Sequence, residues 1–353
     1  MKAAVLEQFR KPLVIHSDWP DPIPNSTDIL VRVKALGICR SDWHNWMGDF
    51  DWLGFEFNLP QVMGHEFSGI VEEAGTEVKK FKKGDRVLLP CITACYTCDN
   101  CRAGFLGQCL TLADTLGVRY PGGYGELAPV PLADLNALHL PDSISFEAAA
   151  SLGCRVMTAF GGVVDRGQTR AGDRIAIHGC GGVGLSAIQV AVAIGAIVVA
   201  IDIDDEKLAF AKELGATYTV NAQNGDVPSA VADLTGGGVD VSIDALGIET
   251  TCRNSILSLR SRGRHVQIGL TTKKEGGQVS VPLDLITLKE LAIVGSAGMS
   301  PARFPALVRM VESGLLKPDR LIKRAVPIEE ASDVIEQMGR FATLGMTVVN
   351  RWW

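Results

Sequence analysis

Four cysteines lie within one short segment of the chain, at Cys95, Cys98, Cys101 and Cys109, in the pattern C-x2-C-x2-C-x7-C. Four thiolates are a common ligand set for a closed, tetrahedral structural zinc site. Two disulfides are the alternative, but nothing else in the sequence indicates an oxidising compartment. The spacing therefore predicts that this segment holds structural zinc.

A second group of residues could bind a dinucleotide. Gly179, Gly181, Gly182, Val183 and Gly184 belong to the run GCGGVG, which follows a strand pattern and opens a helix pattern. In a G-x-G-x-x-G turn the glycines let the backbone approach a pyrophosphate, whose charge the helix N-terminus favours. A tight turn in a fold that binds no cofactor is the alternative. The context of strand, turn and helix favours dinucleotide binding.

Asp202 bears on which dinucleotide would bind. It ends the next strand pattern, eighteen residues after Gly184. A carboxylate at this position accepts hydrogen bonds from the adenosine ribose and repels a 2′-phosphate. Residues 202–206 contain no arginine that would attract such a phosphate. The sequence therefore predicts NAD rather than NADP.

Three further candidate metal ligands, Cys39, His65 and Cys154, are far apart in the sequence. Two thiolates and one imidazole would leave the fourth tetrahedral position open, as a catalytic zinc site requires. Each residue alone has an ordinary interpretation, because an isolated cysteine is most often a small buried apolar residue. Spacing by itself therefore leaves both a catalytic zinc site and three unrelated core residues open.

The apolar pattern divides the chain into regions that would position these residues. In residues 1–154, short β-rich runs between turn residues predict a mostly antiparallel, barrel-like domain; the runs are 29–35, 69–73 and 85–89. In residues 155–293, alternating strand and helix patterns predict a parallel α/β domain. Residues 294–353 should rejoin the first domain, with a helix near 302–313 and a strand near 346–350.

Within the α/β region the expected elements follow one another closely. Strands are expected at 174–178, 198–202, 239–244 and 265–268, and helices at 185–194, 206–214 and 252–259.

The composition is that of a globular enzyme. The chain has 353 residues, 47% of them hydrophobic and 21% charged, which suggests two domains. Its net charge of −6 gives no general attraction to nucleic acid or anionic lipid. The N-terminal residues lack the features of a signal peptide, and the longest apolar stretch, 190–201, is too short to span a bilayer. We therefore expect a cytoplasmic protein with no nucleic-acid or membrane partner.

Four linked motifs resemble the zinc-dependent medium-chain dehydrogenase/reductase family, the alcohol dehydrogenases, over nearly the whole chain. They are CRSDWH at 39–44, GHEFSG at 64–69, the four-cysteine segment, and GCGGVG followed by Asp202. The resemblance implies a GroES-like β-barrel catalytic domain and a doubly wound parallel-sheet (Rossmann) domain for NAD. It also implies two zinc ions per chain, a small alcohol or carbonyl substrate, and a homotetramer, with a dimer as the alternative.

The resemblance also implies roles for single residues around the catalytic metal. Cys39, His65 and Cys154 would bind this zinc. Glu66 would be a nearby carboxylate that can exchange onto the metal, and Asp42 would orient His65.

Other positions would contact the substrate and the cofactor. By resemblance, Ser41 would bond the substrate oxygen, and His44 would end a proton relay that runs through the nicotinamide ribose. Arg40 would meet the pyrophosphate, and Lys207 would lie near the adenosine ribose. The residues that would line the nicotinamide are Thr158, Leu246, Gly269 and Leu270.

Two features bear on affinity and substrate. Met346 stands where many relatives have the arginine of a Gly-Arg pair that assists the pyrophosphate, so cofactor binding should be weaker. Six aromatic residues between the Cys39 and His65 motifs favour bulky apolar substrates, or else fill a core or a subunit contact: Trp43, Trp46, Phe50, Trp52, Phe55 and Phe57. By resemblance, Cys91 would line the substrate pocket and leave room there.

We therefore expect turnover of medium-chain or aromatic primary and secondary alcohols. A polyol or sugar dehydrogenase of the same family is the first alternative, which the apolar 43–57 segment disfavours. A non-catalytic NAD-binding protein is the second.

Overall fold

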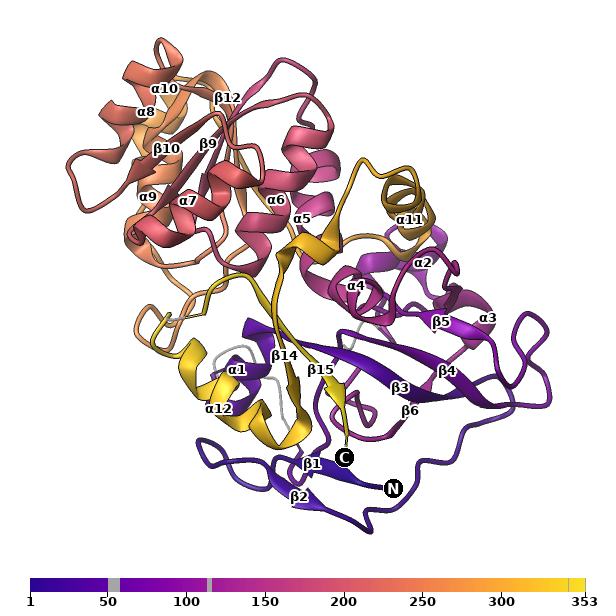
Figure 1. Ribbon diagram of the computed structural model, residues 1–353. Coiled ribbons are helices and arrows are strands. Elements are labelled where there is room, and N and C mark those ends of the chain that lie inside the picture. Colours follow the sequence, from indigo (N-terminus) through magenta and orange to yellow (C-terminus); the bar gives the residue numbers. More distant parts are fainter. Residues whose placement is uncertain (50–57, 113–115, 342, 353) are drawn as a thin grey trace. The chain divides into compact units, whose positions relative to one another are not determined.

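The computed structural model describes residues 1–49, 58–112, 116–341 and 343–352 (Figure 1). The chain forms two compact units, one of Met1–Met157 with Ser300–Trp353 and the other of Thr158–Met299. The first unit is thus built from both ends of the chain, and the second is one continuous insertion.

The first unit contains a seven-stranded sheet in the order β14-β15-β3-β4-β5-β7, with β6 paired to β3. Its pairs are antiparallel except β14 with β15, so the antiparallel character expected from the short β-rich runs is confirmed. The strands of this unit, including a separate hairpin of β1 and β2, are β1 Ala3–Val5, β2 Val14–His16, β3 Ile29–Ile38, β4 Phe67–Ala74, β5 Arg86–Leu88, β6 Leu127–Val130, β7 Leu138–His139, β14 Ile322–Pro327 and β15 Met346–Arg351.

Short helices connect these strands. They are α1 Arg40–Met47, α2 Asp99–Arg102, α3 Ala133–Asn136, α4 Phe146–Ser151, α11 Phe304–Glu312 and α12 Ala331–Met338, with 3-10 turns at Leu106–Gln108, Pro301–Arg303, Pro318–Leu321 and Ile328–Glu330. After α4 the chain continues helically through a π-helical turn at Leu152–Val156, then α5 Met157–Phe160, and a second π-helical turn at Gly161–Arg166. Such wide turns are frequent at functional sites because they redirect side chains, and the first one contains Cys154.

The second unit is a parallel sheet of six strands in the order β10-β9-β8-β11-β12-β13. Counted from β8, this is the order 3-2-1-4-5-6 of a doubly wound dinucleotide-binding fold. Successive strands are added on one side of β8 as far as β10, and on the other side from β11 onwards, so the strand order reverses between β8 and β11. The strands are β8 Arg174–His178, β9 Ile197–Asp202, β10 Tyr218–Asn221, β11 Val239–Asp244, β12 Leu259–Gln267 and β13 Ala292–Gly295. The helices are α6 Gly182–Ala193, α7 Asp205–Glu213, α8 Val227–Thr235, α9 Glu249–Leu257 and α10 Leu283–Leu288.

Every strand and helix expected in the α/β region is present near its predicted bounds, although β12 begins at Leu259, six residues before the predicted start. Four elements of this region were not predicted: β10, α8, α10 and β13. The strand β10 is a four-residue run, YTVN, that is only partly buried, so its apolar pattern is weak. No helix in the described part of the chain has the length and apolar character needed to cross a membrane.

Candidate functional site

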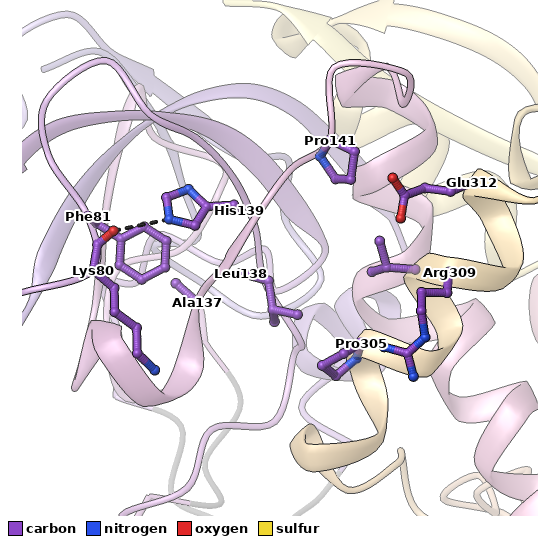
Figure 2. Close-up of a pocket in the computed structure, with 10 residues that line it drawn as sticks. Lys80, Phe81, Ala137, Leu138, His139, Pro141, Pro305, Arg309 and Glu312 are labelled. Carbon is purple, nitrogen blue, oxygen red and sulfur yellow. Dashed lines mark hydrogen bonds between the residues drawn. The ribbon is translucent and has the colours of Figure 1, made fainter.

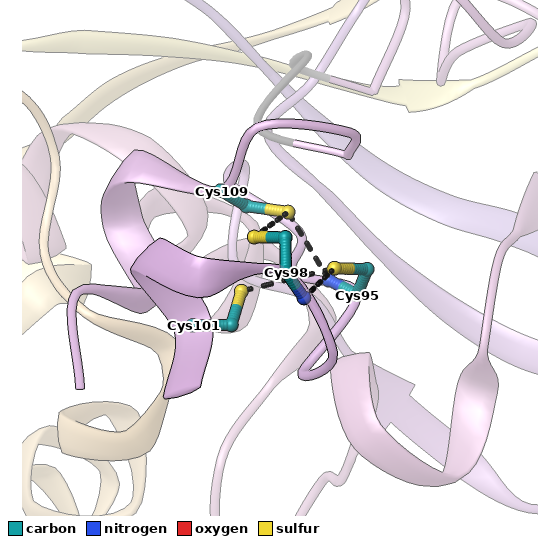
Figure 3. Close-up of side chains that lie close together, drawn as sticks. All are labelled: Cys95, Cys98, Cys101 and Cys109. Atoms are coloured by element: carbon teal, nitrogen blue, oxygen red, sulfur yellow. Dashed lines mark hydrogen bonds between the residues drawn. The ribbon is translucent and has the colours of Figure 1, made fainter. Parts of the chain in front are cut away.

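The four cysteines of the 95–109 segment converge on one point (Figure 3). Their sulfur atoms all lie within 4.8 Å of one another, with Cys95 to Cys101 at 3.9 Å and Cys98 to Cys109 at 4.0 Å. Two sulfurs bound at about 2.3 Å to one tetrahedral ion would be about 3.8 Å apart. The arrangement therefore fits a zinc ion with four thiolate ligands.

Backbone amides support negative charge on these sulfurs. The N–H groups of Thr97 and Cys98 donate to Cys95 Sγ at 3.4 and 3.3 Å. The hydroxyl groups of Thr111 and Thr97 and these amides lower the pKa of Cys95 to about 5. A thiolate that is already favoured before metal binding is a better zinc ligand.

Cys39, His65 and Cys154 also converge, although they come from three distant parts of the first unit. Their ligand atoms lie within 4.8 Å of one another, and Cys39 Sγ is 3.9 Å from Cys154 Sγ. His65 is 2% exposed, and its Nε2 atom has no hydrogen-bond partner among the described residues. A buried nitrogen without a partner is costly unless a ligand satisfies it. These three residues therefore fit a metal ion, with one tetrahedral position left over.

The first turn of α1 positions two members of this centre. Cys39 is the N-cap of α1, and Asp42 at the third helical position accepts a hydrogen bond from the Cys39 backbone N–H at 2.8 Å. The other carboxylate oxygen of Asp42 lies 3.3 Å from His65 Nδ1. Asp42 therefore keeps the proton of His65 on Nδ1 and leaves Nε2 as the ligand atom. Tyr124, which the sequence analysis did not single out, donates its hydroxyl to the same carboxylate at 3.4 Å.

Glu66 is held by Arg155, which the sequence analysis also missed. The guanidinium Nη2 lies 2.5 Å from Glu66 Oε2, and the Arg155 backbone N–H and Nε donate to Oε1 at 2.8 and 3.1 Å. Burial disfavours charge on Arg155, but Glu66 outweighs this effect and raises the pKa of the guanidinium. Gly37 makes room for the pair, since a Cβ there would lie 2.3 Å from Glu66 Oε2. An arginine beside Cys154 thus neutralises the carboxylate that follows His65.

The remaining predicted residues of the 39–44 motif lie on α1. Ser41 Oγ is 3.8 Å from Cys39 Sγ, beside the metal centre. His44 Nδ1 is 3.1 Å from Asp49 Oδ2, a partner that no spacing rule indicated. Burial and the nearby Arg40 lower the pKa of His44, and Asp49 opposes this shift.

Arg40 is packed between two aromatic rings. Its guanidinium lies 3.7 Å from the centre of the Trp43 ring and 4.5 Å from that of Phe341, and it donates to the Met338 carbonyl. Burial lowers the pKa of Arg40 to about 10.

The glycine-rich turn of the second unit follows β8 and opens α6. Gly184 packs closely, because a Cβ there would lie 1.8 Å from the Gly179 carbonyl oxygen. A Cβ on Gly181, by contrast, would meet nothing within 4 Å among the described residues, so the backbone there is open to a ligand. Asp202 stands at the same turn and accepts the Cys180 N–H at 2.6 Å. The turn therefore fits a pyrophosphate, with a carboxylate placed near the expected ribose.

The other predicted cofactor residues are also in the second unit. Lys207 is buried on α7, and its charge acts on the Cys180 thiol of the turn. Leu246 follows β11, while Gly269 and Leu270 follow β12. A Cβ on Gly247 would lie 2.3 Å from the Leu270 carbonyl oxygen, so these two loops touch. Thr158 begins the unit, on α5, and is buried.

The aromatic segment is only partly described. Phe50, Trp52, Phe55 and Phe57 lie outside the described residues. Trp43 belongs to the hydrophobic core of the first unit, and Trp46 packs against that core and donates to the Lys11 carbonyl. Trp43 therefore has a packing role.

Cys91 is buried, and its thiol lies 3.9 Å from Met157 Sδ. The thiols of Cys39 and Cys91 both raise the pKa of Cys154.

A pocket of about 330 Å³ lies elsewhere in the first unit (Figure 2). It is formed by the segment around His139 and by Pro305, Arg309 and Glu312 of α11. None of the predicted metal, catalytic or cofactor residues lines it.

Comparisons with known proteins agree with this arrangement. A family model described as Alcohol dehydrogenase GroES-like domain matches residues 25–142, and one described as Zinc-binding dehydrogenase matches residues 182–313. An NAD-dependent alcohol dehydrogenase of Sulfurisphaera tokodaii is 32% identical over 355 residues, covering 99% of each chain. A D-arabitol-phosphate dehydrogenase of Enterococcus avium is 32% identical over 326 residues, covering 90% of this chain and 88% of that one. The crystal structure of an alcohol dehydrogenase from Aeropyrum pernix matches with a TM-score of 0.89 and 29% identity, covering 99% of this chain and 100% of that one.

The chain belongs to the zinc-dependent medium-chain alcohol dehydrogenase family, as its four motifs indicated. The GroES-like domain and the parallel α/β domain expected from the resemblance are confirmed. The described residues of the first unit form an open sheet, since no pairing joins its outer strands β14 and β7.

Proposed function

We propose that the protein is a zinc-dependent alcohol dehydrogenase that transfers hydride reversibly between a primary or secondary alcohol and NAD, giving an aldehyde or ketone. The observation that carries this proposal is the convergence of Cys39, His65 and Cys154, with a buried His65 Nε2 that has no hydrogen-bond partner among the described residues. A three-ligand centre with an open position is the arrangement of catalytic zinc, whereas the four-thiolate centre has none. The NAD-dependent relatives support the choice of cofactor.

The residues of the centre have separate tasks. Zinc, when held by Cys39, His65 and Cys154, supplies a Lewis acid that makes the substrate hydroxyl more acidic. The glycine-rich turn and Asp202 would hold NAD, which would supply the hydride acceptor. Ser41 lies beside Cys39 and orients the substrate oxygen through its hydroxyl. Arg155 holds Glu66 by a bidentate ion pair, which keeps a second carboxylate charge from acting on the centre.

His44 handles the proton that the alcohol releases. Asp49 accepts a hydrogen bond from His44 Nδ1–H, so Nε2 is the nitrogen that takes up the proton. When NAD is bound, its nicotinamide ribose would supply the hydroxyl group that links Ser41 to His44, and His44 would hold the released proton. In the reverse direction His44 would supply that proton. Its lowered pKa leaves the imidazole neutral, and so able to accept a proton, at neutral pH.

Asp202 is proposed to select NAD over NADP. Its carboxylate is fixed at the glycine-rich turn by the backbone N–H groups of Cys180 and Ile203, so it cannot turn away from a 2′-phosphate at low cost. We expect Asp202→Gly to reduce the preference for NAD in kcat/KM, because the repulsive charge is removed. Equal use of both cofactors by the unmodified enzyme would contradict this assignment.

We propose medium-chain or aromatic alcohols as substrates. This proposal rests on the apolar 43–57 segment of the sequence. If that segment lines the substrate pocket, each buried CH₂ gains about 0.8 kcal/mol, so hexanol and benzyl alcohol should exceed ethanol by more than about tenfold in kcat/KM. Ethanol, hexanol, benzyl alcohol and sorbitol should be compared with NAD as acceptor. A kcat/KM that falls with chain length would contradict the substrate class, and absence of NAD reduction with any alcohol would contradict the reaction itself.

A polyol or sugar dehydrogenase is the second candidate, because a relative of that kind covers most of the chain. It predicts that sorbitol exceeds benzyl alcohol in the same panel. The non-catalytic alternative predicts NAD binding without turnover.

We also propose a homotetramer, with a dimer as the alternative, located in the cytoplasm. The edge strand β13 is unpaired on its outer side among the described residues, and the segment before it exposes apolar side chains, Leu283 at 68% and Leu288 at 85%. A second copy that covers this edge would remove both features from water. None of the nine cysteines forms a disulfide, which suits a reducing compartment. Light scattering at micromolar concentration tests the assembly, and a monomer would contradict it.

For the domains we propose a catalytic domain of residues 1–154 with 294–353 and a cofactor domain of residues 155–293. The two compact units support this division, with slightly different bounds.

A further inference from the structure

A row of buried polar side chains crosses one face of the parallel sheet in the second unit. Ser242 and Asp244 on β11 are in register with His265 and Gln267 on β12. Ser242, Asp244 and His265 are at most 1% exposed. Strands buried on both faces of a parallel sheet are normally apolar. Polar side chains here cost stability unless they are fully hydrogen-bonded, so their arrangement calls for a reason beyond packing.

The row forms one continuous chain of hydrogen bonds. Ser242 Oγ lies 2.8 Å from Ser255 Oγ on α9, which lies 2.8 Å from His265 Nδ1. His265 Nε2 is 3.1 Å from Gln267 Oε1. The Gln267 amide nitrogen then donates to Asp244 Oδ2 at 3.0 Å and to the Gly269 carbonyl at 2.8 Å.

The direction of this chain is fixed by its last members. The Asp244 carboxylate and the Gly269 carbonyl can only accept, so the Gln267 NH₂ group must face them and its oxygen must face His265. His265 Nε2 must therefore carry a hydrogen, and its Nδ1 accepts from the Ser255 hydroxyl. Such a chain holds the Gln267 amide in a single orientation.

This chain of hydrogen bonds ends at the two loops proposed to line the nicotinamide. Asp244 Oδ1 accepts the backbone N–H groups of Leu246 and Gly247 at 2.9 and 3.1 Å. The Asp244 backbone carbonyl accepts the N–H of Gly269 at 2.9 Å. Gln267 thus joins the loop after β11 to the loop after β12 through one amide group. Both loops leave the carboxyl ends of strands, beside the point where the strand order reverses and where such folds bind their ligands.

We propose that Gln267, oriented by His265, is a positioning residue that sets the nicotinamide end of the NAD site without contacting the adenosine end. This inference rests on the proposed function, because the nicotinamide contacts of Leu246 and Gly269 are part of that proposal. Asp202 and the glycine-rich turn, which would hold the other half of the dinucleotide, share none of these hydrogen bonds. Binding of the two halves of the cofactor should therefore respond differently when these hydrogen bonds are removed.

The test compares two ligands that differ only in the nicotinamide. Dissociation constants for NADH and for ADP-ribose are measured by calorimetry on the zinc-loaded enzyme. We expect Gln267→Leu to weaken NADH binding by about tenfold or more and to leave ADP-ribose binding within about twofold. With alcohol and NAD, kcat/KM should fall by at least the same factor. Gln223→Leu, an exposed change in the same unit, is the matched control and should alter neither constant.

A second pair of variants tests the orienting role of His265. His265→Gln keeps an N–H donor near the position of Nε2 and should retain most NADH affinity, whereas His265→Leu removes the donor and should behave like Gln267→Leu. This pair also serves if Gln267→Leu fails to fold. Equal weakening of both ligands, or no weakening of NADH, would overturn the inference and leave the proposed function in place. If the unmodified enzyme bound neither ligand, the proposed function would fail, and the inference with it.

Discussion

The two cysteine-rich centres of the first unit are built in opposite ways. The four-thiolate centre takes all its ligands from residues 95–109, and local backbone N–H groups support its sulfurs. The Cys39–His65–Cys154 centre takes its ligands from three distant segments and depends on the side chains of Asp42, Glu66 and Arg155. A loop that closes on itself can serve stability alone. An open centre needs a folded domain around it to hold three ligands and leave the fourth position accessible.

The largest expected effect separates the two centres by activity. We expect Cys39→Ser to lower kcat by at least about 10³-fold, because the Lewis acid contributes several kcal/mol to the transition state. Metal analysis should show the loss of one zinc and the retention of the other. The melting temperature should change little. Residual activity above a few per cent would mean that this centre is not the catalytic one.

The converse change should act on stability. We expect Cys98→Ser to release the four-thiolate zinc and to lower the melting temperature by about 10 °C, since metal binding to this loop contributes folding free energy. Scanning calorimetry with and without a chelator measures this effect. Cys252→Ala, which removes a buried thiol outside both centres, is the control and should keep the chelator dependence of the unmodified protein. If Cys98→Ser melted like the unmodified protein, the structural role would be refuted.

A smaller effect should come from the residue that orients His65. In Asp42→Asn the side-chain amide would donate to His65 Nδ1 and move the imidazole proton to Nε2, where it blocks metal binding. We expect the zinc affinity of the open centre to fall by about 10- to 100-fold, with the four-thiolate centre unaffected. Competition with a chromophoric chelator resolves the two sites. Equal weakening of both would indicate a general loss of structure instead.

The smallest effect concerns His178, a second buried histidine, which has no carboxylate partner in the part of the chain that the structure describes. Burial opposes charge on both rings, but Asp42 outweighs it and raises the pKa of His65, whereas burial and the nearby His265 lower the pKa of His178 to about 3. Among the described residues neither ring nitrogen of His178 has a hydrogen-bond partner. The folded protein therefore binds this proton less readily than the unfolded chain, whose histidine titrates near pH 6.5. The stability due to neutral His178 is complete above pH 6.5 and is lost as the pH falls towards 3.

His178→Leu should flatten this pH dependence. Between pH 6.5 and 5 we expect the free energy of unfolding to fall less steeply than in the unmodified protein, by up to about 1.4 kcal/mol per pH unit. Urea unfolding at pH 7.5, 6.0 and 5.0 measures the difference. Parallel curves for the two proteins would show that His178 does not titrate on unfolding.

The sequence by itself determined the parts of the protein that depend on local pattern. The four-cysteine spacing indicated a zinc site because its ligands are neighbours in the chain, and the sulfurs do meet within 4.8 Å. The GCGGVG run between β8 and α6 indicated a dinucleotide turn for the same reason, and the α/β alternation indicated the parallel sheet. The motifs from CRSDWH to GCGGVG also indicated the family, since each one keeps its spacing.

Only the tertiary structure decided which distant side chains meet. Arg155 follows the predicted zinc ligand Cys154, yet no spacing rule shows that its guanidinium pairs with Glu66. Nor does spacing show that this pair occupies the room left by Gly37, which has no side chain. Asp49 at His44 and Gln267 between Asp244 and Gly269 are of the same kind. Such pairs form because folding brings chain segments together and buried charges and amides must then find partners. Sequence pattern specifies the period of a helix or strand, but the choice of partner depends on packing between elements, which no local pattern encodes.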